Sequence, residues 1–380
     1  EEGHEGFGFS VSVESIREQL PDLISDDRYI DISLPKLLSG SYGPINGIIK
    51  HDPDCICVRT FDPGVVVSDA IMEAKFFNPY SATEDDHGHS HGVGNWDYGF
   101  IMRSSYIIND TFHALIIRSD GWWYHVKRIG NVESYLINSG KSEFINTQYN
   151  HYNKVNIMMI GEEGWLFVND QFVTTLDLNS ITKPGRLLAF TGYSAGDSVT
   201  GFSTMFEGLS IRPIDQIYNL GSHSLIHDSV DGQPESIDTK ISLSDGLLKV
   251  NVSNPYSKGL GGWDYGVLFR HDEQSYPFYS LIVDSEGIWR YLMHTDEGYH
   301  PLSMSSAQSL NTAIHMTNNL ALVTLGNKGW FFMNGELLSV FDIHEMYESP
   351  NVFVATGLLD GNEISGEYTR LADLGIWGAR

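Results

Sequence analysis

A histidine-rich segment is the clearest place in this sequence where residue types could do metal chemistry. His87, His89 and His91 alternate with small residues, directly after the carboxylates of Asp85 and Asp86. Imidazole is a common ligand of Zn²⁺ and other transition metals, and carboxylates can complete such a coordination shell. The segment therefore predicts a metal site. Because histidine enrichment is only a compositional signal, a polar loop that binds no metal is the alternative.

The tetrapeptide Trp-Asp-Tyr-Gly occurs twice, and each copy joins an aromatic ring to a carboxylate. The rings of Trp96 and Trp263 could stack on the apolar face of a sugar, while Asp97 and Asp264 accept hydrogen bonds from its hydroxyl groups. These four residues are therefore candidate ligand contacts. The alternative is a buried Trp beside an Asp that caps a turn. Recurrence favours this alternative, because two copies of one fold need the same packing residues.

An arginine follows each tetrapeptide in the sequence. We expect Arg103 and Arg270 to pair with Asp97 and Asp264 within one sheet. Such a pair would be structural rather than a means of ligand recognition.

The paired acids of a glycoside hydrolase are not found at the required spacing. Carboxylates at positions i and i+2 of a strand point into one cleft, as a two-carboxylate mechanism needs. The acidic run at 84–86 lies in a loop-like stretch, and Asp284 and Glu286 stand at a turn. Nucleophile-elbow, P-loop and His-Glu-x-x-His motifs do not occur. The sequence therefore predicts a non-catalytic protein, and a hydrolase with an unrecognised site is the alternative.

Several acidic turns offer hard oxygen ligands for Ca²⁺, although none has the spacing of an EF-hand. They contain Asp120, Asp177, Asp342 and the run 360–363. Ca²⁺ is therefore a second candidate metal beside a transition metal such as Zn²⁺, and the sequence makes neither certain.

Two further features concern covalent chemistry. Cys55 and Cys57 stand two residues apart, where a disulfide would be strained, so we expect two thiols. Glycosylation sequons begin at Asn109 and Asn251, and they matter only on a secretory route.

The charge balance excludes several classes of partner. The 380 residues include 23 Lys and Arg against 49 Asp and Glu, a formal net charge of −26. Such a chain is unsuited to neutralising phosphates or an anionic bilayer, so we expect no nucleic acid partner. No run of about 18 apolar residues occurs, so we expect no membrane insertion. An acidic chain fits an extracellular or cell-surface location, where salt screens self-repulsion.

An internal duplication organises the chain. Asn-Pro-Tyr-Ser, Trp-Asp-Tyr-Gly, a Gly-Trp-aromatic hairpin and Thr-Gly recur in one order, and the offset settles from 167 residues at Trp-Asp-Tyr-Gly to 165 at the end. We therefore expect an N-terminal arm at 1–42 and two modules at 43–213 and 219–380. The histidine-rich segment falls in an insertion of 9 residues in the first copy. The short link at 214–218 predicts that the modules pack with little freedom.

Alternating apolar and polar residues, as at 248–253, predict many short strands separated by turns. The ordered motifs resemble the concanavalin A-like lectin/glucanase superfamily, in particular its laminin-G-like and 3-keto-disaccharide-hydrolase-like domains of bacterial surface proteins. The resemblance covers both modules. It implies an all-β fold of two tandem concanavalin-like jelly-roll β-sandwiches with a short N-terminal arm. It also implies sugar or Ca²⁺ sites in edge loops, often without activity.

Differences between the copies point to function more than shared residues do. Recurring tryptophans such as Trp165 and Trp330 are expected in the core, whereas Trp122 is replaced by Ile288. If exposed, Trp122 and Tyr124 are the better ligand candidates, and packing is the alternative. We expect an extracellular binding protein that recognises glycans or another surface component. The alternative is a structural subunit that assembles with further copies of itself into a filament, sheath or surface layer.

Overall fold

The computed structural model describes residues 36–51, 58–80, 94–105, 111–130, 134–194, 201–227, 234–270, 277–342, 351–359 and 364–379. Several predictions fall outside these ranges and stay predictions. They concern Asp85, Asp86, His87, His89, His91, Cys55, Cys57, Asn109, the acidic run 360–363 and residues 1–35 of the arm.

Every regular element of the described residues is a β-strand. Residues 36–213, the N-terminal half, contain β1 (Lys36–Leu37), β2 (Tyr42–Lys50), β3 (Arg59–Phe61), β4 (Val65–Val67), β5 (Ala70–Phe77), β6 (Asp97–Ser104), β7 (Phe112–Arg118), β8 (Trp122–Arg128), β9 (Tyr135–Lys141), β10 (Tyr152–Ile160), β11 (Glu163–Val168), β12 (Gln171–Asp177), β13 (Gly185–Thr191) and most of β14 (Ser203–Leu220). Residues 214–379, the C-terminal half, contain the end of β14 and β15 (His223–Ile226), β16 (Glu235–Ser242), β17 (Gly246–Ser253), β18 (Asp264–Arg270), β19 (Phe278–Asp284), β20 (Ile288–Thr295), β21 (Gly298–Ser306), β22 (Thr317–Leu325), β23 (Lys328–Met333), β24 (Glu336–Asp342), β25 (Asn351–Thr356) and β26 (Tyr368–Ala379).

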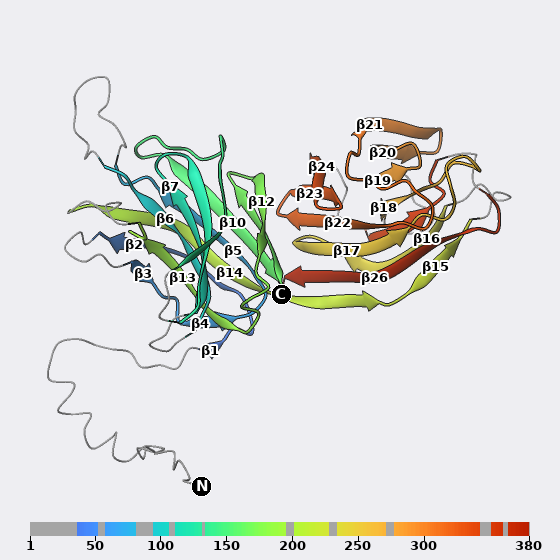
Figure 1. Cartoon of the computed structure of the whole chain (residues 1–380). Coiled ribbons are helices and arrows are strands. Elements are labelled where there is room, and N and C mark those ends of the chain that lie inside the picture. The colour runs from blue at the N-terminus through green and yellow to red at the C-terminus, as the bar shows by residue number, and fades with distance from the viewer. Residues whose placement is uncertain are drawn as a thin grey trace, which may run out of the picture.

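Three sheets build the molecule (Figure 1). The N-terminal front sheet has the order β1-β4-β13-β6-β7-β8-β9, with β3 also on β13. The C-terminal front sheet has the order β16-β25-β18-β19-β20-β21. A 12-stranded back sheet runs through both halves in the order β12-β11-β10-β5-β14-β26-β17-β22-β23-β24, with β2 also on β14 and β15 on β26. The all-β sandwich fold predicted from the sequence is confirmed.

Strand β14 joins the two halves. Its residues 203–213 pair with β2 and β5, and its residues 214–220 pair with β26. The segment 214–218, expected to be a short link, is therefore part of a strand with its own hydrogen-bonded partner. Figure 1 shows β14 and β26 where the halves meet, beside the C-terminus. A continuous ladder couples the halves because a paired strand lacks the freedom of a flexible linker.

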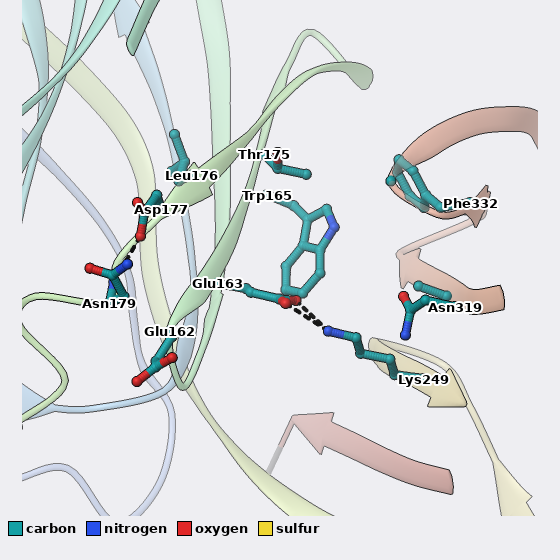
Figure 2. A pocket seen from close by; sticks show the side chains of 12 residues that line it. Glu162, Glu163, Trp165, Thr175, Leu176, Asp177, Asn179, Lys249, Asn319 and Phe332 are labelled. Atoms are coloured by element: carbon teal, nitrogen blue, oxygen red, sulfur yellow. Dashed lines mark hydrogen bonds and ion pairs between the residues drawn. The ribbon is translucent and has the colours of Figure 1, made fainter. Parts of the chain in front are cut away.

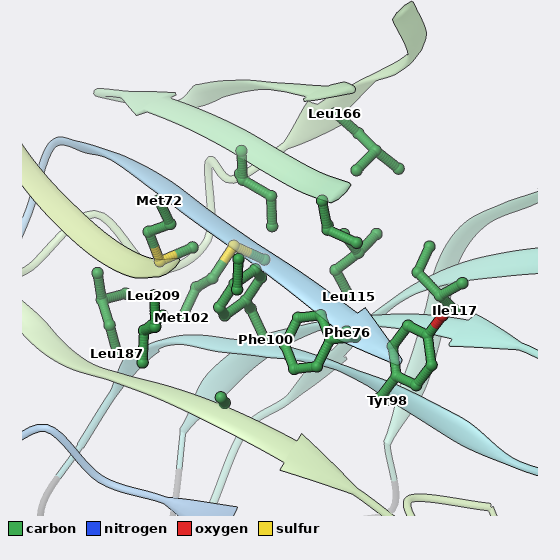
Figure 3. Packing of buried hydrophobic residues seen from close by; sticks show 14 of the residues in the cluster. Met72, Phe76, Tyr98, Phe100, Met102, Leu115, Ile117, Leu166, Leu187 and Leu209 are labelled. Atoms are coloured by element: carbon green, nitrogen blue, oxygen red, sulfur yellow. The ribbon is translucent and has the colours of Figure 1, made fainter. Parts of the chain in front are cut away.

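The core of the N-terminal half forms where back strand β5 faces the front sheet. Met72, Ala74 and Phe76 of β5 are buried, while the residues between them are only half-buried, as the alternation of a strand requires. The ring of Phe76 stacks on Tyr98 at 4.9 Å and meets Phe100 edge-on at 5.3 Å (Figure 3). These contacts fix β6 relative to the back sheet.

A buried asparagine network ties the loop after β9 to this core. Asn153 donates from Nδ2 to Tyr98 Oη at 2.6 Å and accepts the backbone N–H of Asn146 at 2.7 Å. Tyr98 donates to Asn78 Oδ1 at 2.8 Å, and Asn169 donates to Asn153 Oδ1 at 3.0 Å. Burial raises the pKa of Tyr98, so its hydroxyl remains a neutral donor. Burying these amides is tolerated because each finds partners.

The C-terminal half repeats this network. Asn318 donates to Tyr265 Oη at 2.9 Å and accepts the backbone N–H of Asn311 at 2.8 Å. Tyr265 donates to Asn254 Oδ1 at 3.1 Å, and Asn334 donates to Asn318 Oδ1 at 2.8 Å. The same residue types therefore make the same bonds in both halves.

A further apolar cluster lies between the halves. Trp165 and Phe167 of β11 face Trp330 and Phe332 of β23, and the rings of Phe167 and Trp330 are 4.3 Å apart. Trp165 is 4% exposed and Trp330 is 1% exposed. Both tryptophans are buried as expected, but they pack in the joint rather than inside a sandwich. Residues between them along the strands, such as Leu166, point into the sandwich instead.

Candidate functional site

The Trp-Asp-Tyr-Gly motif lies inside each half, which corrects the prediction that it contacts a ligand. Trp96 is 0% exposed and Trp263 is 2% exposed. Asp97 is also 0% exposed, and it accepts the backbone N–H groups of Tyr193 at 2.9 Å and Ser194 at 2.7 Å. The first motif therefore caps the turn after β13, and its ring offers no face to a sugar.

Asp264 has the same role in the C-terminal half. It is 2% exposed and accepts the backbone N–H groups of Leu358 at 2.8 Å and Leu359 at 3.0 Å. A carboxylate that receives two backbone donors satisfies amides that would otherwise be buried without partners. Both copies of the motif are therefore a buried Trp beside an Asp that caps a turn.

Arg103 is structural, but its partner differs from the expected one. It donates to Asp69 Oδ1 at 3.2 Å and to the carbonyls of Ser68 at 3.0 Å and Ile181 at 2.8 Å. Asp97 begins the same strand, roughly 20 Å away for an extended chain. The predicted pair with Asp97 is therefore wrong. The side chain of Arg270 lies outside the described structure.

Buried histidines in the N-terminal half are held neutral. Nδ1 of His113 lies 3.0 Å from Nε2 of His125, and both side chains are 0% exposed. Burial lowers the pKa of His113 to about 3 and that of His125 to about 4. It also lowers the pKa of His51, which lies 2.9 Å from Thr204 Oγ1, to about 4. Such imidazoles stay uncharged near neutral pH and do not act there as proton donors.

The candidate site lies on the outer face of β7, β8 and β9, at the free edge of the N-terminal front sheet. We call it the outer strip and define it by Arg118, Trp122, Tyr124, Arg128 and Lys141. Successive strand residues alternate between faces, so Trp122 and Tyr124 point outward because Trp123 between them enters the core. Lys141 is the register partner of Trp122 and stands on the same face.

Two aromatic rings form the centre of the outer strip. Trp122 is 37% exposed, and its ring lies 6.2 Å from that of Tyr124 with an interplanar angle of 25°. The guanidinium carbon of Arg118 lies 5.7 Å from the Tyr124 ring centroid, and its Nη1 is 3.4 Å from Tyr124 Oη. The arginine therefore holds one ring while the other stays open. The two rings together make an apolar platform with polar groups at its rim.

The matching positions of the C-terminal front sheet carry different chemistry. Ile288 stands where Trp122 stands, and Arg290 stands where Tyr124 stands. Arg290 pairs with Asp284 at 2.7 Å. Asp284 also accepts the backbone N–H groups of Glu286 at 2.9 Å and Ile288 at 3.0 Å. These positions are closed by their own ion pair and carry no aromatic ring, and the exposed ring of Tyr299 lies across from His294 at the other end of β20.

A separate hollow of about 570 Å³ lies at the other end of β8 and β9. It is lined by Lys127, Ile129, Tyr135, Leu136 and Ile137. Tyr135 is 50% exposed and Leu136 is 58% exposed.

A second cleft, of about 440 Å³, lies between the halves (Figure 2). Lys249 of β17 donates to Glu163 of β11 at 2.7 Å across it. The rings of Trp165 and Phe332 line the cleft but are only 4% and 2% exposed. Because these rings are buried in the apolar cluster between the halves, the cleft offers little aromatic surface on which a sugar ring could stack. The outer strip is therefore the better candidate site.

The expected calcium and glycosylation positions have local partners. Asp120 accepts the backbone N–H of Trp122 at 3.2 Å, and Asp177 accepts that of Asn179 at 3.1 Å. Asn251 donates to Asp373 at 3.1 Å. Across the described ranges, no group of three or more His, Cys, Asp or Glu side chains is placed to hold a metal ion.

Membrane-spanning helices are not found in the part of the chain that the structure describes.

Comparisons with known proteins give matches among solved structures. No protein-family model matches the chain, and no curated protein matches it. Among solved structures, the chain is similar to the carbohydrate-binding module CBM66 from Bacillus subtilis, with 12% identity over 41% of this chain and 94% of the module, at a TM-score of 0.30. It is similar to a Bacillus licheniformis β-glucanase, with 11% identity over 42% of this chain and 78% of the enzyme, at 0.31. Sheep galectin-11 matches with 12% identity over 34% of this chain and 96% of the galectin, at 0.27.

Proposed function

We propose that this chain is a non-catalytic, extracellular carbohydrate-binding protein whose ligand lies on the outer strip. The observation that carries this proposal is the ring pair of Trp122 and Tyr124. Its two rings are neighbours and close to parallel, and Trp122 is exposed on the outer face while Tyr124 is half-buried. Rigid aromatic side chains give a large contact area at a small cost in conformational entropy, which suits an open binding surface.

The residues beside the rings supply hydrogen-bonding groups for sugar hydroxyls. Lys141 stands directly across from Trp122 in the register, and Ser139 stands across from Tyr124. Arg118 lies against the Tyr124 ring and 3.7 Å from Asp120 at the adjoining turn. Apolar rings with polar groups at their rim are the arrangement expected of a sugar site, because a pyranose has an apolar face and polar edges.

Hydrolysis is not part of the proposal. A two-carboxylate mechanism needs two acids on either side of the scissile bond. The three strands β7, β8 and β9 contain no Asp or Glu. Asp120, at the turn between β7 and β8, is engaged with a backbone N–H and with Arg118.

A glycan array probed with the wild-type chain and two variants tests the proposal. Trp122→Ile gives the outer strip the residue found at the matching position of the other half. We expect binding to fall at least about tenfold, because a stacked aromatic is a typical hot spot. Ile288→Ala is the matched control and should leave binding unchanged. Retention of full binding by Trp122→Ile, or no binding by the wild-type chain to any glycan, would contradict the proposal.

Self-assembly is a second candidate function, favoured by the free edge of the C-terminal front sheet. All nine residues of β21 are exposed, and they include Tyr299, Leu302 and Met304. An exposed edge strand with apolar side chains is a template for pairing with another chain. Light scattering over a concentration series tests this idea, with Met304→Lys as the variant that should keep the chain monomeric. A wild-type chain that stays monomeric at high concentration would contradict it.

A further inference from the structure

The charges of strands β7, β8 and β9 run against those of the whole chain. The chain has a net charge of −26. These three strands of 7 residues each contain no acidic residue and four cationic ones, which are Arg118, Lys127, Arg128 and Lys141. Arg118, Arg128 and Lys141 lie on the outer face, and Lys127 lies on the opposite face. The outer face is therefore locally basic on a strongly acidic protein, although random placement would put mostly acids there.

Two of these cations flank the ring pair on the same face. Lys141 is exposed and lies across from Trp122, at one end of β8. Arg128 ends β8 and lies across from Phe112, whose ring belongs to the outer-face cluster. The two cations are roughly 20 Å apart for an extended strand. Trp122 is level with Lys141, and Tyr124 and the buried Val126 lie between Trp122 and Arg128. An elongated ligand lying along β8 would meet a positive charge at each end.

Arg118 contributes less to this positive field. It lies 3.7 Å from Asp120 and stands across from the buried Asp97 in the register. Its main contact with the site is the Tyr124 ring. Lys141 makes no ion pair among the described residues, and Arg128 donates from Nε to the carbonyl of Gly130 at 3.2 Å. Recognition of a negative group therefore rests on Lys141 and Arg128.

The C-terminal front sheet shows that the fold does not require this charge. Its corresponding strands β19, β20 and β21 contain one arginine and one aspartate, Arg290 and Asp284, and these two neutralise each other at 2.7 Å. The basic character is therefore specific to the sheet that also carries the exposed ring pair.

We infer that the outer strip selects anionic glycan chains, carrying uronate or sulfate groups, over neutral chains of the same backbone. This inference rests on the proposed function. The rings stack on sugar units in the middle of the bound segment, while Lys141 and Arg128 form charge-assisted hydrogen bonds with anionic groups toward its ends. At physiological ionic strength, charges further than about 8 Å away are largely screened, so the acidic remainder of the chain opposes binding only weakly.

Matched pairs of polysaccharides test the inference with the full chain. Polygalacturonate is compared with its fully methyl-esterified form, and dextran sulfate is compared with dextran, so that each pair differs in charge. We expect at least about tenfold tighter binding to the charged member, with an affinity that falls as salt is added. Lys141→Gln should weaken binding of the charged member about three- to tenfold and leave the neutral member unchanged. Lys183→Gln removes an exposed cation on the segment before β13 and is the control.

The outcomes separate the inference from the proposed function. Equal binding of charged and neutral members, lost in Trp122→Ile and kept in Lys141→Gln, would overturn the inference and keep the carbohydrate site. If Trp122→Ile binds the charged polysaccharides as tightly as the wild-type chain does, the proposal that sugars stack on the ring pair is wrong. Preference for polygalacturonate identifies uronate as the favoured group, and preference for dextran sulfate identifies sulfate. Tighter binding to oligothymidylate than to either polysaccharide would overturn the glycan class.

Discussion

The outer faces of β8 and β20 occupy matching places in two sheets but differ in chemistry. On β8, Trp122 and Tyr124 form an open ring pair. On β20, Ile288 and Arg290 stand at the same positions, and Arg290 is neutralised by Asp284 at 2.7 Å. The buried asparagine networks of the two halves, around Asn153 and Asn318, make the same hydrogen bonds. The difference teaches that the shared residues maintain the fold, while the exposed positions of one sheet are available for binding.

The buried asparagine networks give the largest expected effect, and they test the part of the comparison that should be equal. Asn153→Ala and Asn318→Ala should each destabilise the protein by about 3 kcal/mol, because each takes a hydrogen-bond partner from two donors and three acceptors. Chemical denaturation measures both. Asn179→Ala, at an exposed amide, is the control and should change stability by less than about 0.5 kcal/mol. Clearly unequal losses for the two buried residues would show that the networks are not equivalent.

Acid should weaken the N-terminal half more than the C-terminal half. Among the described histidines, burial lowers the pKa to about 3 to 4 for His51, His113 and His125, and in the other half to about 4 for His294. Between an unfolded pKa near 6.5 and these folded values, the unfolded state binds more protons, so stability falls as pH falls. Each such histidine costs up to about 1.4 kcal/mol per pH unit in that window.

Hydrogen exchange at pH 7 and pH 5 measures this acid effect strand by strand. Amides of β7 and β8 should lose protection before those of β19 and β20. The positions of His113 and His125 are occupied by Tyr279 and Tyr291 in the other half, which explains the contrast. Equal loss of protection in both front sheets would contradict it.

Transplanting the outer strip tests whether exposed chemistry alone separates the two faces. The triple variant Asp284→Arg, Ile288→Trp and Arg290→Tyr gives the second face three of the five outer-strip residues, those at Arg118, Trp122 and Tyr124. Because the frameworks match, we expect the number of bound oligosaccharides to rise from about one to about two, at an affinity within about tenfold of the first site. Isothermal titration calorimetry measures this number. An unchanged number with a folded variant would mean that the framework also differs.

The ion pair in the joint should give the smallest effect. Glu163 and Lys249 are 51% and 28% exposed, and they lie 2.7 Å apart. Exposed pairs of this kind contribute about 1 kcal/mol or less, so Glu163→Gln should lower the free energy of unfolding only slightly. Denaturant titration measures the change, with Glu162→Gln beside it as control. A loss of several kcal/mol would show that the pair, rather than the aromatic cluster, holds the halves together.

The fold class was readable from the sequence because alternation and turn residues report strands directly. The alternation of Leu248, Val250 and Val252 with polar residues placed β17 correctly. Which face of a strand meets which neighbour was not readable. Trp165 and Leu166 are both large and apolar, yet one packs in the joint and the other in the core. Only the arrangement of three sheets decides this.

The candidate site was partly readable from the differences between the copies. Replacement of Trp122 by Ile288 marked a residue that the fold does not demand, and Trp122 is 37% exposed, whereas the conspicuous tetrapeptides proved to be buried caps. Arg103 was misassigned because charge complementarity alone ignores the length of an extended strand. The roles of Arg118 and Lys141 were missed, since only the pairing register brings them beside Trp122 and Tyr124. The lack of Asp and Glu across β7, β8 and β9 was a signal in the sequence that could have indicated a basic surface there.

A crystal structure of the chain with a bound oligosaccharide tests the central claim most directly. The ligand would be the tightest binder from the glycan array, at a concentration well above its dissociation constant. The account predicts sugar rings over Trp122 and Tyr124, with the ligand running along β8 between Lys141 and Arg128. A ligand bound instead over Ile288 on β20, or in the cleft between Glu163 and Lys249, would contradict it.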